Sequence, residues 1–170
     1  MKSVTIAGGG LAGLSLGIGL RRHGVPVEVF EASTFPRHRV CGEFISGVSE
    51  ETLEALGIQE DLSDAGELTG TAWYDHKGRV FSASLPSPAR GISRFRLDDR
   101  LSIRLRELGG GFREGERFAS ERAGEDGVVN ATGRALEKGS AWLGLKAHWS
   151  FIEIICPGKC SALCSSINLV

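Results

Sequence analysis

The chain has 170 residues, of which 41% are hydrophobic and 24% are charged, and its formal net charge is −1 at pH 7. This composition is typical of one globular domain and excludes a strongly basic nucleic-acid binder. No apolar run reaches the roughly 18 residues of a transmembrane helix. Three of the four cysteines crowd near the C-terminal end, unlike a disulfide framework, so we expect a reduced, cytoplasmic protein.

The first 31 residues predict a βαβ unit. A β-branched run at residues 4–6 is followed by the turn GGGLAG at residues 8–13, and an apolar helical pattern continues to residue 23. A second strand is expected at residues 27–30, and it is followed directly by Glu31. The turn has the spacing G-x-G-x-x-G, which in this context indicates a dinucleotide-binding site.

Each part of the turn has a physical role in that interpretation. Gly8 permits the tight turn out of the strand, Gly10 lets the backbone approach a pyrophosphate, and Gly13 lets the helix pack closely on the sheet. The first helical residues, Leu11 and Ala12, present N–H groups and a partial positive charge to the phosphates.

The acidic end of the second strand completes the fingerprint. Glu31 is placed to accept hydrogen bonds from a ribose 2′-hydroxyl, with Ala32 beside it, and its charge opposes a 2′-phosphate. The alternative is a glycine-rich packing turn without a ligand. No G-K-[ST] follows the glycines, which argues against a P-loop. These residues do not choose between NAD and FAD.

Further elements follow in chain order. Residues 32–47 resemble a loop, and residues 49–56 predict a short helix. Strands at residues 69–74 and 79–83 flank a turn, which predicts a β-hairpin. A helix is expected at residues 98–108, with Asp98 and Asp99 in its first turn. Two more strands are expected, and they cover residues 112–118 and 127–131.

Four segments resemble FAD-dependent oxidoreductases of the geranylgeranyl reductase and aromatic-ring hydroxylase type. They are the fingerprint at residues 8–31, RHRVCGE at residues 37–43, SRFRLD at residues 93–98 and VVNATGR at residues 128–134. The resemblance extends to about Trp149. It implies a Rossmann-like α/β FAD/NAD(P)-binding domain with a β-hairpin insertion, incomplete relative to the family. It also favours FAD over NAD as the tightly held cofactor.

The resemblance implies further cofactor contacts. Arg39 or Arg94 would pair with the pyrophosphate or orient the isoalloxazine, the alternative being solvated ion pairs. Cys41 and Gly42 would lie near the flavin ring. The alternatives for Cys41 are a small, partly buried residue and a redox thiol. A second backbone contact to the dinucleotide is expected after the last strand, and it comprises Ala131, Thr132 and Gly133. The alternative there is an ordinary strand-end turn.

The implied activity is that of a flavin oxidoreductase with NAD(P)H as electron donor and a small isoprenoid or aromatic substrate. The flavin would reduce a carbon–carbon double bond or support hydroxylation, and the C-G-E segment favours the reductase branch. No catalytic side chain is predicted, and the four histidines show no metal-ligand spacing. The alternative function is a truncated, non-catalytic FAD-binding remnant, with a missing second half or a partner chain.

The C-terminal end departs from the resemblance. We expect residues 1–150 to form a partial FAD-binding domain and residues 151–170 to form a cysteine-rich tail that is no domain. Cys156, Cys160 and Cys164 match no usual metal-site spacing. Three alternatives are open for the tail: a metal site, an apolar anchor or partner-binding segment, and a truncated or frame-shifted end without function. The last is favoured, because the tail holds none of the continuation that the family would have.

Overall fold

The fold is taken from a computed structural model, which describes residues 2–39, 41, 43–119, 122, 124–133, 147–155 and 161–169. Two compact units divide the chain. The first comprises residues 1–37 and 43–135, and the second comprises residues 38–42 and 136–170.

The first unit is built on a parallel sheet of four strands in the order β6-β2-β1-β7. The strands are β1 (Val4–Ala7), β2 (Val27–Glu31), β6 (Gly111–Glu114) and β7 (Val128–Asn130). Residue Ile6 of β1 pairs with Val29 of β2 and with Val129 of β7. The predicted βαβ unit is therefore confirmed, and β1 lies at the centre of the sheet, where its carboxyl end leads into the glycine turn.

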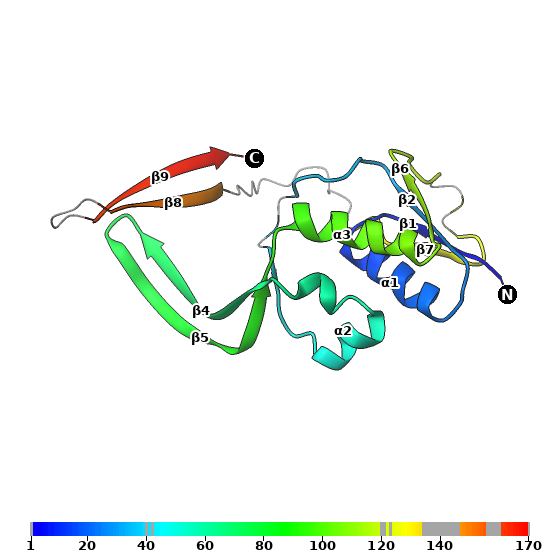
Figure 1. The fold of residues 1–170 in the computed structure, drawn as a ribbon, viewed down its shortest axis with the longest axis horizontal. Coiled ribbons are helices and arrows are strands. Elements are labelled where there is room, and N and C mark those ends of the chain that lie inside the picture. Colours follow the sequence, from blue (N-terminus) through cyan, green and yellow to red (C-terminus); the bar gives the residue numbers. More distant parts are fainter. Residues whose placement is uncertain are drawn as a thin grey trace. The chain divides into compact units, whose positions relative to one another are not determined.

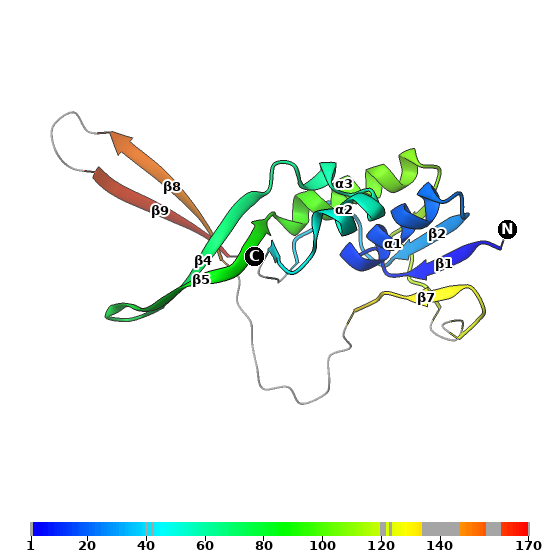
Figure 2. The same ribbon diagram turned by 90° about the horizontal axis from the view of Figure 1, so that it is seen from below.

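Two helices pack on this sheet, α1 (Leu11–Arg22) and α3 (Arg94–Glu107). They lie side by side (Figures 1 and 2), and a side chain at Gly17 of α1 would contact Leu105 of α3 and Val29 of β2. The core between them is apolar and fully shielded from solvent. Its most buried members are Ile6, Leu14, Ile18, Val29, Leu97, Leu101 and Leu105.

Helix α3 begins at Arg94, earlier than the predicted start at Asp98. Ser93 is the N-cap residue, and its hydroxyl accepts a hydrogen bond from the Phe95 N–H at 3.2 Å. Asp98 and Asp99 therefore do not lie in the first turn of the helix, so the prediction that placed them there was wrong. The Asp98 carboxylate instead pairs with Arg94, four residues earlier.

A second sheet holds the predicted hairpin, in the strand order β3-β5-β4. Its strands are β3 (Phe44–Ile45), β4 (Gly66–Asp75) and β5 (Gly78–Gly91). Strand β5 runs beyond its predicted end because it continues past an irregularity that contains Pro86 and Pro88, and its residues Arg90 and Gly91 pair again with β3 and β4. Prolines inside a strand are tolerated at such bulges.

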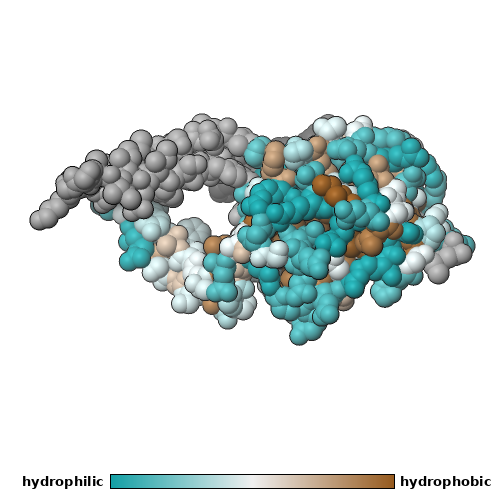
Figure 3. All heavy atoms as spheres, viewed as in Figure 1, coloured by the Kyte–Doolittle hydropathy of each residue, from teal (hydrophilic) through white to brown (hydrophobic). Residues whose placement is uncertain are grey.

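The hairpin is mostly exposed, and pale to brown side chains gather along it on the face drawn in Figure 3. Two short helices, α2 (Glu50–Leu56) and η1 (Glu60–Leu62), precede the hairpin. Helix α2 lies within the predicted range of residues 49–56. Ser49 is its N-cap, and the Ser49 hydroxyl accepts a hydrogen bond from the Thr52 N–H.

In the second unit, β8 (Ala147–Ile155) and β9 (Ser161–Leu169) pair as an antiparallel ribbon. Cys164 lies in β9, whereas Cys156 and Cys160 are outside the described residues, so the alternatives for the tail stay open. The domain boundary at residue 150 likewise remains a prediction. None of the helices that the structure describes is long and apolar enough to cross a bilayer.

Candidate functional site

The glycine turn lies where the carboxyl ends of β1 and β7 meet. Gly8 has φ +108°, and a Cβ atom there would lie 2.4 Å from the Ala131 carbonyl oxygen. The Ala131 N–H donates to the Ala7 carbonyl oxygen at 2.7 Å, which fixes this approach. A Cβ atom at Gly13 would lie 1.9 Å from the Gly8 carbonyl oxygen. The fold itself therefore requires glycine at positions 8 and 13.

Packing does not explain Gly10 in the same way. Its backbone is extended, with φ −78° and ψ −176°, and it is the N-cap of α1 without a side-chain hydrogen bond. Among the described residues, a Cβ atom at Gly10 would meet only Arg94 Nη2, at 3.7 Å. Within the described residues, the space around the Cβ position of Gly10 is therefore open, which suits an anion that approaches the backbone closely.

Arg94 stands beside this space in a fixed orientation. Its Nε and Nη2 atoms donate to the two carboxylate oxygens of Asp98 at 2.7 and 2.8 Å, and Asp98 is fully buried. The Arg94 backbone N–H donates to Glu43 Oε1 at 3.1 Å. Arg94 is thus not in a solvated ion pair, because its acidic partner is shielded from water. The two hydrogen bonds to Asp98 fix the orientation of the guanidinium, whose Nη2 atom lies on the side of Gly10.

Glu31 closes the other side of the glycine turn. The residue is only 4% exposed, and its Oε2 accepts a hydrogen bond from the Gly9 N–H at 3.0 Å. Its Oε1 accepts from the Ser33 N–H at 2.9 Å, and Arg37 Nη2 lies 2.8 Å from Oε2. The carboxylate that the sequence predicts to bind a ribose is therefore hydrogen-bonded directly to the glycine turn.

The segment after β7 lies next to Gly8, as the Ala131 contact shows. The Thr132 N–H and hydroxyl both donate to Asn130 Oδ1, at 3.1 and 2.8 Å, and Gly133 has φ +83°. Thr132 and Gly133 are exposed. Ala32, directly after Glu31, is exposed as well.

Three predicted residues fall in the segment 38–42, which belongs to the second unit. Arg39 and Cys41 are half-buried, and Gly42 lies outside the described residues. Their predicted contacts to the flavin side of the cofactor remain predictions.

Three residues of the site were not predicted as such. Asp98 orients Arg94, Glu43 caps the N-terminus of α3, and Arg37 pairs with Glu31. The i,i+4 spacing of Arg94 and Asp98 on one helix was a usable signal. The Arg37 contact had none, because it depends on how the loop after β2 folds back.

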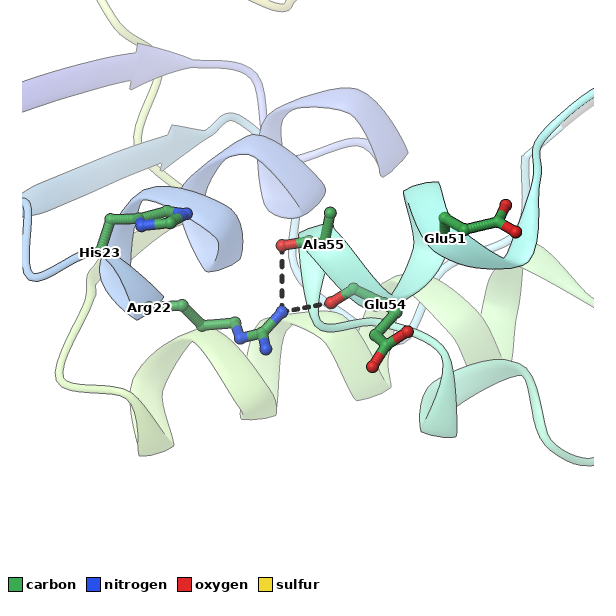
Figure 4. Close-up of a pocket in the computed structure, with 5 residues that line it drawn as sticks. All are labelled: Arg22, His23, Glu51, Glu54 and Ala55. Atoms are coloured by element: carbon green, nitrogen blue, oxygen red, sulfur yellow. Dashed lines mark hydrogen bonds between the residues drawn. The ribbon is translucent and has the colours of Figure 1, made fainter.

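A separate hollow of about 420 Å³ lies between the end of α1 and helix α2 (Figure 4). Arg22 Nη1 donates there to the carbonyl oxygens of Glu54 and Ala55, near the negative end of the α2 dipole. This arrangement is accounted for by helix capping and includes none of the predicted cofactor residues. Among the described residues, no group of three or more His, Cys, Asp or Glu side chains is placed to hold a metal ion.

Buried charge elsewhere in the unit also has a structural role. Burial raises the pKa of the Asp61 carboxyl, although Arg104 Nε lies 2.7 Å from its Oδ2 and opposes that shift. This pair joins η1 to α3. We therefore assign it to the packing of α3.

The chain is similar to one protein family and to several known proteins. The family model described as "FAD binding domain" matches residues 1–148. Aurachin C monooxygenase/isomerase from Stigmatella aurantiaca is 36% identical over 110 residues, which cover 58% of this chain and 28% of that protein. Menaquinone reductase from Mycobacterium tuberculosis is 30% identical over 102 residues, which cover 58% of this chain and 25% of that protein.

A solved structure of 2-methyl-3-hydroxypyridine-5-carboxylic acid oxygenase is similar as well. It has a TM-score of 0.58 and 27% sequence identity, and the match covers 68% of this chain and 32% of the oxygenase. The chain thus spans about a quarter to a third of the length of these similar proteins.

Proposed function

Since the chain belongs to the FAD binding domain family, we propose that the glycine turn and Glu31 hold the adenosine diphosphate half of FAD. The observation that carries this proposal is the open space at Gly10, bordered by the uncapped N-terminus of α1 and the Arg94 guanidinium. The N–H groups of Leu11 and Ala12 would bind the pyrophosphate, and the Glu31 carboxylate would accept a ribose hydroxyl. The residues present fit the group in their chemistry, since the first-turn amides of α1 and the Arg94 guanidinium are donors that suit an anion, and the Glu31 carboxylate is an acceptor that suits a hydroxyl.

The remaining predicted residues have proposed roles in the same site. Arg94 would pair with the pyrophosphate, and the backbone of residues 131–133 would make a second contact, supported by its position beside Gly8. We assign the flavin side of the cofactor to three residues of the C-G-E region, namely Arg39, Cys41 and Gly42. Ala32 would line the ribose beside Glu31.

For the whole protein we propose an FAD-dependent oxidoreductase that uses NAD(P)H and acts on a small isoprenoid or aromatic substrate. Bound FAD supplies the electron-transfer chemistry, while the chain binds it, orients it and excludes water. The similar proteins include a monooxygenase/isomerase and a reductase, which supports oxidoreductase chemistry without choosing a branch. A cytoplasmic location is proposed from the cysteine pattern alone.

The first experiment is FAD binding by the purified chain, measured by flavin absorption and by identification of the released nucleotide. Gly10→Ala should weaken FAD binding by about tenfold or more, equivalent to about 1.4 kcal/mol. Its unfolding free energy should change by less than about 1 kcal/mol, because the new methyl group meets only Arg94. Gly19→Ala in α1 is the matched control and should bind FAD normally. Equal affinity of the Gly10 variant and wild type would refute the phosphate site.

A second measurement separates catalysis from binding alone. If the chain is an oxidoreductase by itself, it should oxidise NADH or NADPH when loaded with FAD. If it is a binding remnant, it should retain FAD and leave the nicotinamide unoxidised above the rate of FAD in buffer.

A further inference from the structure

We propose that Arg37 is a positioning residue for the nucleotide, acting through the Glu31 carboxylate. This inference rests on the proposed function, because it takes Glu31 to bind the ribose of FAD. Arg37 lies in the loop after β2 and was not among the predicted cofactor residues. We propose that it acts on the ligand indirectly, by holding the Glu31 carboxylate in place and offsetting its negative charge.

Contacts of several kinds hold the Arg37 side chain. Its Nη2 atom lies 2.8 Å from Glu31 Oε2, and its Nη1 atom donates to Ser33 Oγ. Its guanidinium carbon lies 5.2 Å from the centroid of the Phe35 ring. The side chains of Arg37 and Glu31 are only 16% and 5% exposed. The guanidinium is thus held by a charge, a hydroxyl and a ring at once.

The loop that carries Arg37 is anchored on β6 and α3. The Phe35 ring stacks on Phe112, with centroids 5.6 Å apart, and the Arg106 guanidinium lies 4.6 Å from the Phe112 ring. The Phe35 N–H donates to Glu114 Oε1. This stack makes the position of Arg37 a property of the folded sheet rather than of a loose surface loop.

The charge arrangement explains why the site needs a cation here. Glu31 accepts the Gly9 N–H, one residue before Gly10, so its negative charge lies next to the loop proposed to bind a pyrophosphate. Two anions in a partly buried site disfavour each other. Arg37 offsets the Glu31 charge and keeps its carboxylate turned toward Gly9, which allows a carboxylate and a pyrophosphate to occupy neighbouring positions.

A double-mutant cycle with FAD as the probe tests this proposal. The Kd of FAD is measured for wild type, Arg37→Met, Glu31→Gln and the double variant. Arg37→Met should weaken binding by about tenfold in the wild-type background and by no more than about twofold in the Glu31→Gln background. Arg37→Lys, which keeps the charge without the forked donors, should recover part of the loss. The matched control is Arg113→Met, which removes an exposed Arg–Glu pair of the same sheet and should leave Kd unchanged.

The outcomes distinguish a failure of the Arg37 positioning role from a failure of the proposed function. An equal loss in both backgrounds, or no loss on Arg37→Met, overturns the positioning role while FAD binding by wild type still stands. Absence of FAD binding by wild type overturns the proposed function instead. If Arg37→Met unfolds, the Arg37→Lys variant carries the test, since it should still lose affinity only while Glu31 is present.

Discussion

Neighbouring glycines of the same turn have different physical reasons to be glycine. Gly13 is needed by the fold, because a Cβ atom there would lie 1.9 Å from the Gly8 carbonyl oxygen and 3.2 Å from Ile6 Cγ2. Gly10 has no such close contact within the described residues, which supports its proposed role in binding a pyrophosphate. The two roles can be measured separately. Replacing a glycine that the fold needs should lower the unfolding free energy, whereas replacing a glycine that binding needs should lower the affinity for FAD.

We predict that Gly13→Ala destabilises the chain by about 1–3 kcal/mol, because the helix must move away from the turn. Gly19→Ala, in the same helix and with only ordinary contacts, should stabilise it by about 0.5–1 kcal/mol. Urea unfolding followed by circular dichroism compares the two variants with wild type. Equal stability of Gly13→Ala and wild type would contradict the close packing of α1 on the turn.

The elements are held together by charge as well as by the apolar core. Helix α3 carries Arg96, Arg100 and Arg104 on successive turns, and the acids after α2 face them. Asp64 accepts two hydrogen bonds from Arg100, at 2.6 and 2.9 Å, and also pairs with Arg96. Hydrogen bonding from Arg100 holds the pKa of Asp64 well below its ordinary value.

The pH dependence of this contact has a definite sign. A carboxylate whose pKa is lowered by folding stabilises the protein above its unfolded pKa of about 3.9, and this contribution is lost as the pH falls. Asp64→Asn should therefore lower the melting temperature at pH 7, and the difference from wild type should shrink on acidification below about pH 4. Thermal melts of both proteins at several pH values measure this difference in melting temperature. Asp126→Asn, at an exposed position, is the control, and a difference independent of pH would argue against the ion pair.

At the scale of the molecule, the first unit divides between a buried core and an exposed hairpin. Trp73 and Phe81 lie opposite each other in β4 and β5 and are 66% and 55% exposed, whereas Leu101 in α3 is fully buried. Most of the folding free energy of this unit must therefore come from the α1–α3–sheet core. The aromatic residues of the hairpin add little to it.

Substitutions in the two regions should differ accordingly. Phe81→Ser should change the unfolding free energy by less than about 0.5 kcal/mol, since more than half of the side chain is already in water. Leu101→Ala should cost about 2–5 kcal/mol, because it leaves a cavity between helix and sheet. Chemical denaturation of both variants tests the division. A large loss from Phe81→Ser would show that the hairpin is packed in solution.

The sequence by itself determined the βαβ unit, the glycine spacing and the position of Glu31, because these depend on periodicity and turn chemistry within one short stretch. It also predicted the hairpin and helices α2 and α3. It placed the start of α3 too late, because the Ser93 cap and the Arg94–Asp98 pair were not recognised.

Only the tertiary structure decided which distant residues meet at the turn. The parallel order of the strands brings Ala131 against Gly8, and the packing of α3 brings Arg94 beside Gly10. The folded loop after β2 brings Arg37 onto Glu31. Such contacts depend on strand order and on the path of a loop, which leave no periodic trace in the sequence.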